Sequence, residues 1–151
     1  MKRIIVMIVV IMIFSVALFA VKKANNEKEK AAIKKVIQEA YVDGIKNLGN
    51  IEKIEKGFHP DFNMLSVQDN KLRKFPINSW IEGVEKAKRE NPNGPKIKTS
   101  VNFLMVDVVG NVGIAKFETY SGSKLAFTDI MVLLKFEEGW RIVSKVYHRH
   151  E

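Results

Sequence analysis

The sequence of 151 residues contains no cysteine. This absence excludes disulfide bonds, thiolate catalysis, cysteine-ligated metals and a lipid-modified cysteine at an export site. A glycine-rich phosphate loop, the nucleophile elbow of hydrolases and the paired histidines of a metalloprotease helix are also missing. We therefore expect no cofactor and no metal. There is no internal repeat, and the length suits one domain preceded by a targeting segment.

Acidic residues are fewer than basic ones, 17 against 25, and the formal net charge is +8. Such an excess attracts anionic partners: nucleic acid, lipid headgroups or a charged ligand. The lysines are nevertheless scattered among glutamates, as in Lys28–Glu29–Lys30, which is typical of a solvated surface. We expect no nucleic-acid partner, because an exported protein has little occasion to meet a chromosome. Association with an anionic membrane surface stays open.

The N-terminus carries a targeting signal, predicted over residues 1–21. Ile4 to Val21 is a run of eighteen residues without a charge, preceded by Lys2 and Arg3. This length lies where a long signal peptide and a short membrane span overlap. Ser15-Val16-Ala17 supplies a cleavage site, whereas flanking lysines at 22–23 would suit an uncleaved anchor. We favour a signal peptide, and expect export to the periplasm or the extracellular space in either case.

Three helices are predicted after a polar linker over 22–28. The first is amphipathic, with apolar residues every three or four positions. Gly49-Asn50 ends it, and Ser79-Trp80-Ile81-Glu82 is a capping box for the third. The predicted elements are the helices Glu29–Leu48, Ile51–Gly57 and Ser79–Arg89, with a loop at 58–61 and short strands at 62–67 and 72–75.

Everything after the break at Asn91–Pro95 has the composition of β-strands. Four long runs are rich in β-branched and aromatic residues, and short turns join them, which predicts an antiparallel meander. Helices followed by strands indicate an α+β fold with the helices on one face of the sheet. The domain then spans 29–151, with strands at 97–109, 112–120, 125–136 and 140–148.

The last hairpin has a predicted register. A three-residue loop, Glu137-Glu138-Gly139, suits a type I turn closed by a left-handed glycine. Phe136 then lies opposite Trp140, and Ile130 opposite Val146. The face with these four residues is almost wholly apolar, so we predict that it is the core face.

Asp129 falls on the other face of this hairpin, opposite Tyr147 and diagonal to Lys145. A carboxylate among apolar neighbours needs a partner, which Lys145 or Arg141 could provide. Apolar residues on both faces of the hairpin imply that both faces are covered by other parts of the structure. A second subunit, a helix or a ligand pocket would cover the second face.

Four segments of the chain match the pattern of one family. They are Tyr41-Val42-Asp43-Gly44, Phe58-His59-Pro60-Asp61, Phe127–Leu133 and Gly139–Val143 with Lys145. These segments resemble the putative lumazine-binding branch of the nuclear-transport-factor-2-like superfamily, which includes ketosteroid isomerases and polyketide cyclases. The resemblance runs from about residue 29 to 148. It implies a cone-like fold, with N-terminal helices packed on a strongly curved antiparallel sheet, a cone that holds a small ligand, and pairing through the sheet.

Two residues are candidates for catalysis. His59 precedes a proline, where a general base is plausible, although we favour a role in fixing the local backbone. Asp129 would serve as a general base in an apolar pocket that raises its pKa, although pairing with Lys145 favours a structural ion pair.

Aromatic residues supply the other candidates. Tyr41 and Trp80 lie on helix faces that should meet the sheet, where core packing is the default and pocket lining the alternative. His148 and His150 alternate on one strand, but no third metal ligand accompanies them. The predicted ligand-binding residues are Tyr41, Phe58, His59, Trp80, Asp129 and Lys145.

Three functions remain open for such a domain. We favour a small-molecule-binding module, because no clear pair of opposed titratable groups is present. The alternatives are a cofactor-independent isomerase, dehydratase or cyclase that uses an acid/base pair in the cone, and a dimeric interaction domain without a ligand. The expected partners are a small molecule, a second copy paired through the sheet, and the membrane if the N-terminal segment stays uncleaved.

Overall fold

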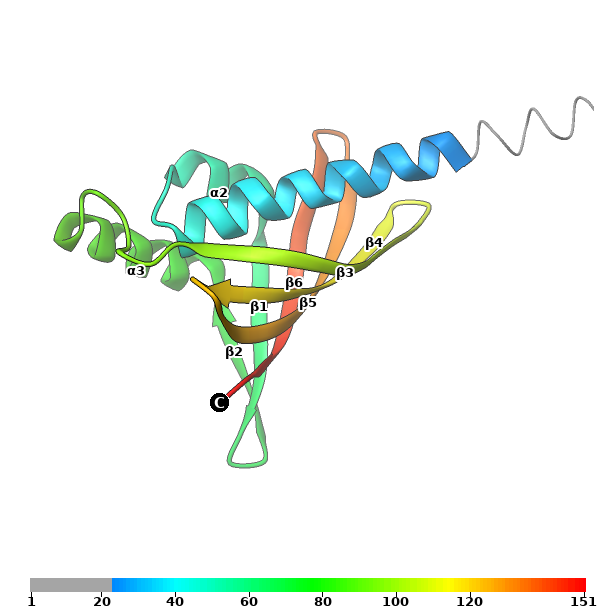
Figure 1. The fold of residues 1–151 in the computed structure, drawn as a ribbon. Helices are drawn as coiled ribbons and strands as arrows, with labels where there is room; N and C mark the ends of the chain where they lie inside the picture. Colours follow the sequence, from blue (N-terminus) through cyan, green and yellow to red (C-terminus); the bar gives the residue numbers. More distant parts are fainter. Residues whose placement is uncertain (1–22) are drawn as a thin grey trace, which may run out of the picture.

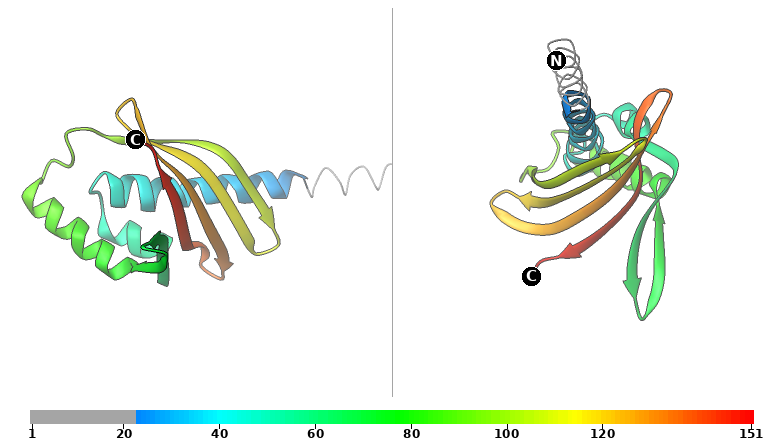
Figure 2. Two further views of the ribbon diagram at one scale, coloured as in Figure 1. Left: turned by 90° about the horizontal axis from the view of Figure 1, so that it is seen from below. Right: turned by 90° about the vertical axis from the view of Figure 1, so that its right-hand side faces the viewer.

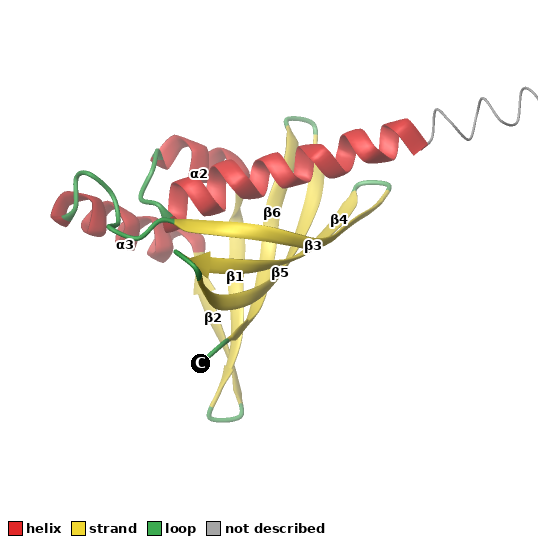
Figure 3. Cartoon of the chain, viewed as in Figure 1, coloured by secondary structure: helices red, strands yellow, loops and turns green. Residues whose placement is uncertain are grey.

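The structure, a computed structural model, describes residues 23–151, so the predicted signal peptide or anchor lies outside them. Helices cover one side of a six-stranded sheet with the order β2-β1-β6-β5-β4-β3 (Figures 1 and 3). Neighbouring strands are antiparallel except β1 and β6, which are parallel. This confirms the predicted α+β cone. The strands are β1 (Phe58–Gln68), β2 (Lys71–Pro76), β3 (Thr99–Val109), β4 (Val112–Ser121), β5 (Lys124–Phe136) and β6 (Gly139–Arg149).

The first helix is α-helical over 23–36 and continues as the π-helix η1 (Ile37–Lys46). The predicted linker residues from 23 onward are therefore helical. The wider π turn buries a broad face, which includes Tyr41, and π segments often mark functional sites. Gly44 permits the close approach of the second helix, since a Cβ there would lie 2.6 Å from Ile54 Cγ1.

Two shorter helices follow, α2 (Ile51–Gly57) and α3 (Ile77–Glu90). Asn50 caps α2, because its side-chain oxygen accepts a hydrogen bond from the backbone N–H of the second helical residue. The predicted capping box at Ser79 is wrong: α3 begins at Ile77, after Pro76, and no side chain caps it. The N-cap residue Pro76 has an extended backbone, with φ −73° and ψ 157°. Among residues 23–151, no helix is long and apolar enough to cross a membrane.

The first helix lies along the concave side of the sheet, and the strands β3–β6 curve past it (Figure 2). Alternate residues of β4 face this helix, so Ala115, Phe117 and Thr119 are buried while their neighbours are more exposed. Gly113 lies where the helix passes closest, because a Cβ there would collide with Ile33. The hairpin β1–β2 instead projects away from the helices (Figure 1).

The predicted loop at 58–61 is wrong, because β1 already begins at Phe58. The pairing of Phe58 with Ile142 of β6 draws this segment into the sheet, and a register shift follows before Asn63. A proline is tolerated here because it lies in that irregular part of the ladder.

The predicted core face of the β5–β6 hairpin is wrong for β5 and for Val146, although Trp140 is buried as predicted. The turn has two residues rather than three, so Lys135 pairs with Trp140, and a bulge at Val143 restores the expected pairing of Ile130 with Val146. The buried residues of β5 are consequently Asp129, Met131 and Leu133, the set that we expected on the opposite face. Asp129 is thus in the core.

Candidate ligand-binding site in the cone

Asp129 is the centre of a buried polar cluster. The Tyr41 hydroxyl donates to Oδ2 over 3.0 Å and the Thr119 hydroxyl donates to the same oxygen over 2.5 Å. The Lys145 ammonium lies 2.5 Å from Oδ1. None of the four residues is more than 3% exposed. We call Tyr41, Thr119, Asp129 and Lys145 the cone network.

Four elements bring the network together: η1, β4, β5 and β6. Met131 and Lys145 are paired across β5 and β6, which places Lys145 diagonal to Asp129 on one face, as predicted. Thr119 comes from the buried face of β4, and Tyr41 from η1 above the sheet. Arg141, the other proposed partner, lies elsewhere and approaches backbone carbonyls of Glu55 and Phe58.

Aromatic rings surround the network. The ring of Trp80 packs on Tyr41 with a centroid distance of 5.9 Å, and Lys145 Nζ lies 5.9 Å from the centroid of Trp80 and 4.4 Å from that of Tyr147. Phe58 is buried behind Trp80, with the two centroids 6.2 Å apart. This shell keeps water from the ion pair and provides cation–π contacts to the ammonium.

Burial governs the electrostatics of the site. It raises the pKa of Tyr41 well above its ordinary value, and the Asp129 charge adds to this. The pKa of Lys145 is lowered, chiefly by burial, against the opposing attraction of Asp129. The pKa of Lys46 is lowered by burial first and by repulsion from Lys145 second. Two ammonium groups therefore share a low-dielectric region with one carboxylate.

Lys46 and Phe127 are half-buried and lie next to the cone network, and we call the rim that they form with Tyr147 and Arg149 the mouth of the cone. Lys46 Nζ lies 4.7 Å from the ring centroid of Phe127 and 5.5 Å from that of Tyr41. Phe127 packs edge-on against Tyr147, which is 37% exposed, and the Arg149 guanidinium lies 5.4 Å from the Phe127 centroid. The mouth is thus aromatic and cationic, above a closed polar floor.

His59 is not brought to this site. Its ring stacks on Phe136 with centroids 5.0 Å apart, and its Nδ1 accepts a hydrogen bond from the Asp61 backbone N–H. Phe136 is seven residues from Asp129 along β5, about 23 Å at the rise of a strand. His59 and Asp129 therefore do not face one another as an acid/base pair.

Sequence reasoning missed Thr119, Lys46 and Phe127 as individual site residues. Thr119 had a signal, because it continues the buried alternation of β4 as the polar member of an apolar face. Lys46 had none beyond its place in the last turn of the first helix, where a lysine is ordinarily solvated. Phe127 lies in the closing segment of the resemblance, but no residue pattern singled it out.

Comparisons with known proteins agree with this geometry. The model of the family described as "Putative lumazine-binding" matches residues 28–148. An NTF2-like protein of unknown function from Shewanella baltica is 29% identical, with a TM-score of 0.64, over 82% of this chain and 95% of that chain. Another from Silicibacter pomeroyi shares the fold at 22% identity and a TM-score of 0.65, over 82% and 98% of the two chains.

A relative from a Cladobotryum species is named aldolase FrzH. It is 24% identical over 111 residues, which are 73% of this chain and 83% of that protein. The family match and the Shewanella structure confirm the predicted resemblance.

Proposed function

We propose that this chain, which belongs to the family described as putative lumazine-binding and has the NTF2-like fold, binds a flat polar-aromatic molecule in the mouth of its cone. The observation that carries the proposal is the layered cone: a closed, buried ion pair beneath a half-buried rim of aromatic rings and ammonium groups. Flat aromatic walls with a few fixed charges are typical of sites for small conjugated ligands.

The state of Asp129 favours binding over general-base catalysis. Its Oδ2 already accepts hydrogen bonds from Tyr41 and Thr119, and its Oδ1 is paired with the Lys145 ammonium. A general base needs a free lone pair within reach of the substrate proton. Lys46, in contrast, lies over two aromatic rings, has no carboxylate within 4.0 Å among residues 23–151, and is available to an anionic or carbonyl group of a ligand.

Fluorescence of Trp80 tests the proposal directly. The sequence contains two tryptophans, so Trp140→Phe leaves Trp80 as the only reporter. We expect lumazine, a conjugated heterocycle, to quench Trp80 saturably, and Phe127→Ala or Lys46→Gln to weaken binding about tenfold. Native mass spectrometry of the chain purified from its own cells extends the test to other ligands through the bound mass.

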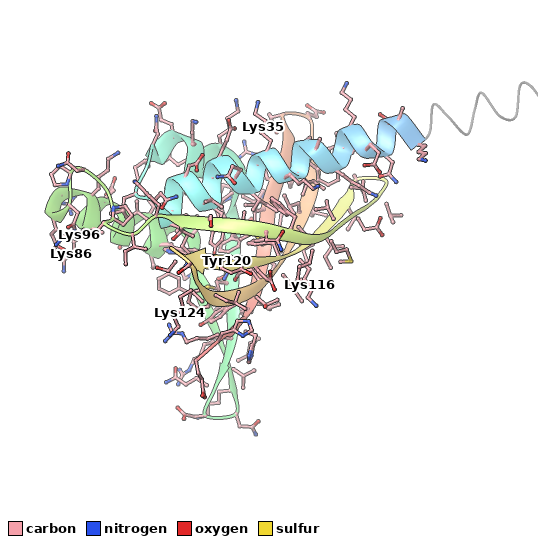
Figure 4. All side chains as sticks on the ribbon, viewed as in Figure 1. Lys35, Lys86, Lys96, Lys116, Tyr120 and Lys124 are labelled. Atoms are coloured by element: carbon pink, nitrogen blue, oxygen red, sulfur yellow. The ribbon has the colours of Figure 1, made fainter. Side chains whose placement is uncertain are left out.

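Lys116→Gln is the matched control, because Lys116 projects from the outer face of β4 (Figure 4). Binding that both mouth variants leave unchanged, or that Lys116→Gln weakens as much as they do, would contradict the proposal. So would the absence of any bound mass together with no response of Trp80 to conjugated probes.

Proton-transfer catalysis is a second candidate function. One observation favours it: the relative named aldolase FrzH is matched over most of both chains. Lys145, with its lowered pKa beside Tyr41, would then exchange the proton while Asp129 holds both groups in place. An aldol cleavage assay with Lys145→Met and Tyr41→Phe would separate the two candidates, since catalysis requires loss of turnover with ligand binding retained in at least one variant.

The outer face of the sheet supports pairing with a second copy. Val112, Ile114 and Val146 are exposed there, next to the half-buried Val132. Burial of a contiguous apolar stripe of this kind drives association. Sedimentation should show a dimer that Ile114→Lys dissociates and that Lys86→Gln, at an exposed position on α3, does not; a monomer at all concentrations would contradict it.

Export is the remaining part of the proposal. It rests on the uncharged run Ile4–Val21 behind Lys2 and Arg3. Fractionation of cells that express the tagged chain should place it outside the cytoplasm. N-terminal sequencing would then distinguish cleavage after Ala17 from a retained membrane anchor, and recovery in the cytoplasmic fraction would overturn export.

A further inference from the structure

A cleft lies apart from the cone, between the first helix, α2 and the tip of the β5–β6 hairpin. Its volume is about 690 Å³, within the range of about 300–1,000 Å³ that is usual for small-molecule sites. None of the cone-network residues lines it. We call it the basic cleft.

The floor of the basic cleft is apolar. The first helix contributes Ala32, Val36 and Ala40 to this floor, and β6 contributes the indole of Trp140. The indole is held in place because its Nε1 donates to Glu29 Oε2 over 2.7 Å. Lys135 Nζ lies 2.7 Å from Glu29 Oε1, so the charge of this carboxylate is already compensated.

The walls of the basic cleft are cationic. Six basic side chains line it against three acidic ones. Four lysines of this wall have no carboxylate within 4.0 Å among residues 23–151, and their side chains are exposed, as Figure 4 shows for Lys35. Unpaired cations around an apolar floor are complementary to an anion that carries an apolar part. The six are Lys28, Lys35, Lys53, Lys56, Lys135 and Arg141.

We infer that the basic cleft binds an anionic amphiphile, a molecule with one acidic headgroup and a single apolar chain. The chain lies on Ala32, Val36 and the face of Trp140, and the headgroup lies between Lys53, Lys56 and Arg141. This site is separate from the proposed cone site and does not depend on it. Each site contains one of the two tryptophans, so the two can be observed independently.

Dodecanoate below its micelle concentration is the probe. In the full chain with Trp80→Phe, the emission of Trp140 should change saturably. The pair Lys53→Glu and Lys56→Glu should weaken binding by at least about tenfold, because it replaces attraction of the headgroup by repulsion. Dodecyl maltoside, with the same chain and no charge, should bind at least about tenfold more weakly than dodecanoate. Calorimetry on the chain with both tryptophans should give the same ranking.

Lys86→Glu with Lys116→Glu is the matched control. It changes the net charge equally at exposed positions on α3 and β4, away from the basic cleft (Figure 4). If both double variants weakened dodecanoate binding equally, the effect would come from overall charge alone, and the proposal would be overturned. A response of Trp80 without one of Trp140 would also overturn it while leaving the cone proposal intact. If the chain bound phosphatidylglycerol vesicles but not monomeric dodecanoate, the cleft would be a membrane-contact surface and not a small-molecule site. This result would also overturn the proposal.

Discussion

The cone and the basic cleft each contain a lysine–carboxylate pair beside a tryptophan, but in very different surroundings. In the cone, Lys145 and Asp129 have side chains 3% and 0% exposed. In the basic cleft, Lys135 and Glu29 are 41% and 17% exposed. The pair distances are similar, 2.5 and 2.7 Å, so burial rather than geometry distinguishes the two.

The difference concerns what each pair can do. A buried pair cannot lose one member without leaving an unsolvated charge, so it fixes the fold around it. A partly exposed pair is screened by water and salt, so it adds little stability and leaves neighbouring cations open to ligands. The cone network is therefore a fixed, buried floor for its site. The cations around the basic cleft, in contrast, stay exposed and can contact a ligand.

Removal of the buried lysine should have the largest effect. Lys145→Met leaves Asp129 uncompensated in the core, and we expect the free energy of unfolding to fall by about 3–5 kcal/mol. Urea denaturation followed by circular dichroism measures this loss. Salt should hardly alter it, because ions do not reach the pair.

The double variant Lys145→Met with Asp129→Asn is the control for this prediction. It removes both charges, so it should be more stable than the sum of the two single losses implies. Strict additivity would mean that the two groups stabilise the protein separately, and the contrast between the two pairs would then fail.

The sequence was sufficient for the strands and for the pairing of Asp129 with Lys145, but not for their place in the protein. Alternation and turn residues located the four long strands within a few residues of their observed ends. The core face was wrong because the two-residue turn puts Trp140 opposite Lys135, and the bulge at Val143 then brings Lys145 opposite Met131 on the same face. A count of hydrophobic residues favours the other face of β5. A local hydrophobic pattern cannot predict that a carboxylate lies on the buried face.

The rest of the site depends on contacts between segments far apart in the sequence. Tyr41 reaches Asp129 across 88 positions, and Lys46 reaches Phe127 only because η1 crosses the sheet at that point. The resemblance to a family supplied the cone but not these partners. Packing of the helix on the sheet, rather than any motif, assembles the mouth.

Loss of the tyrosine hydroxyl should have an intermediate effect. Tyr41→Phe removes one donor to Asp129 while Lys145 and Thr119 remain, and we expect a loss of about 1–3 kcal/mol in the free energy of unfolding. The pKa of Tyr41 is raised above 10.0 in the folded state. Its contribution to stability is therefore complete below the unfolded value and is lost as pH rises above it.

Ultraviolet titration of the phenols provides the matching measurement. Of the three tyrosines, Tyr41 should ionise only when the protein unfolds, and Tyr41→Phe should remove that step. Ionisation of all three phenols in the folded protein near their ordinary pKa would show that the floor of the cone is open to water.

The exposed pair should have the smallest effect. Lys135→Met should cost at most about 1 kcal/mol, and the cost should shrink in high salt, because water and ions screen this pair. Hydrogen bonds from Lys135 first and Trp140 second lower the pKa of Glu29. The contribution of Glu29 is therefore present above its ordinary value of 4.5 and disappears as pH falls through the lowered value in the folded protein. Urea denaturation of the variant and the unmodified chain should then converge at acidic pH. A loss as large and as insensitive to salt as that of Lys145→Met would mean that the basic cleft is as closed to water as the cone.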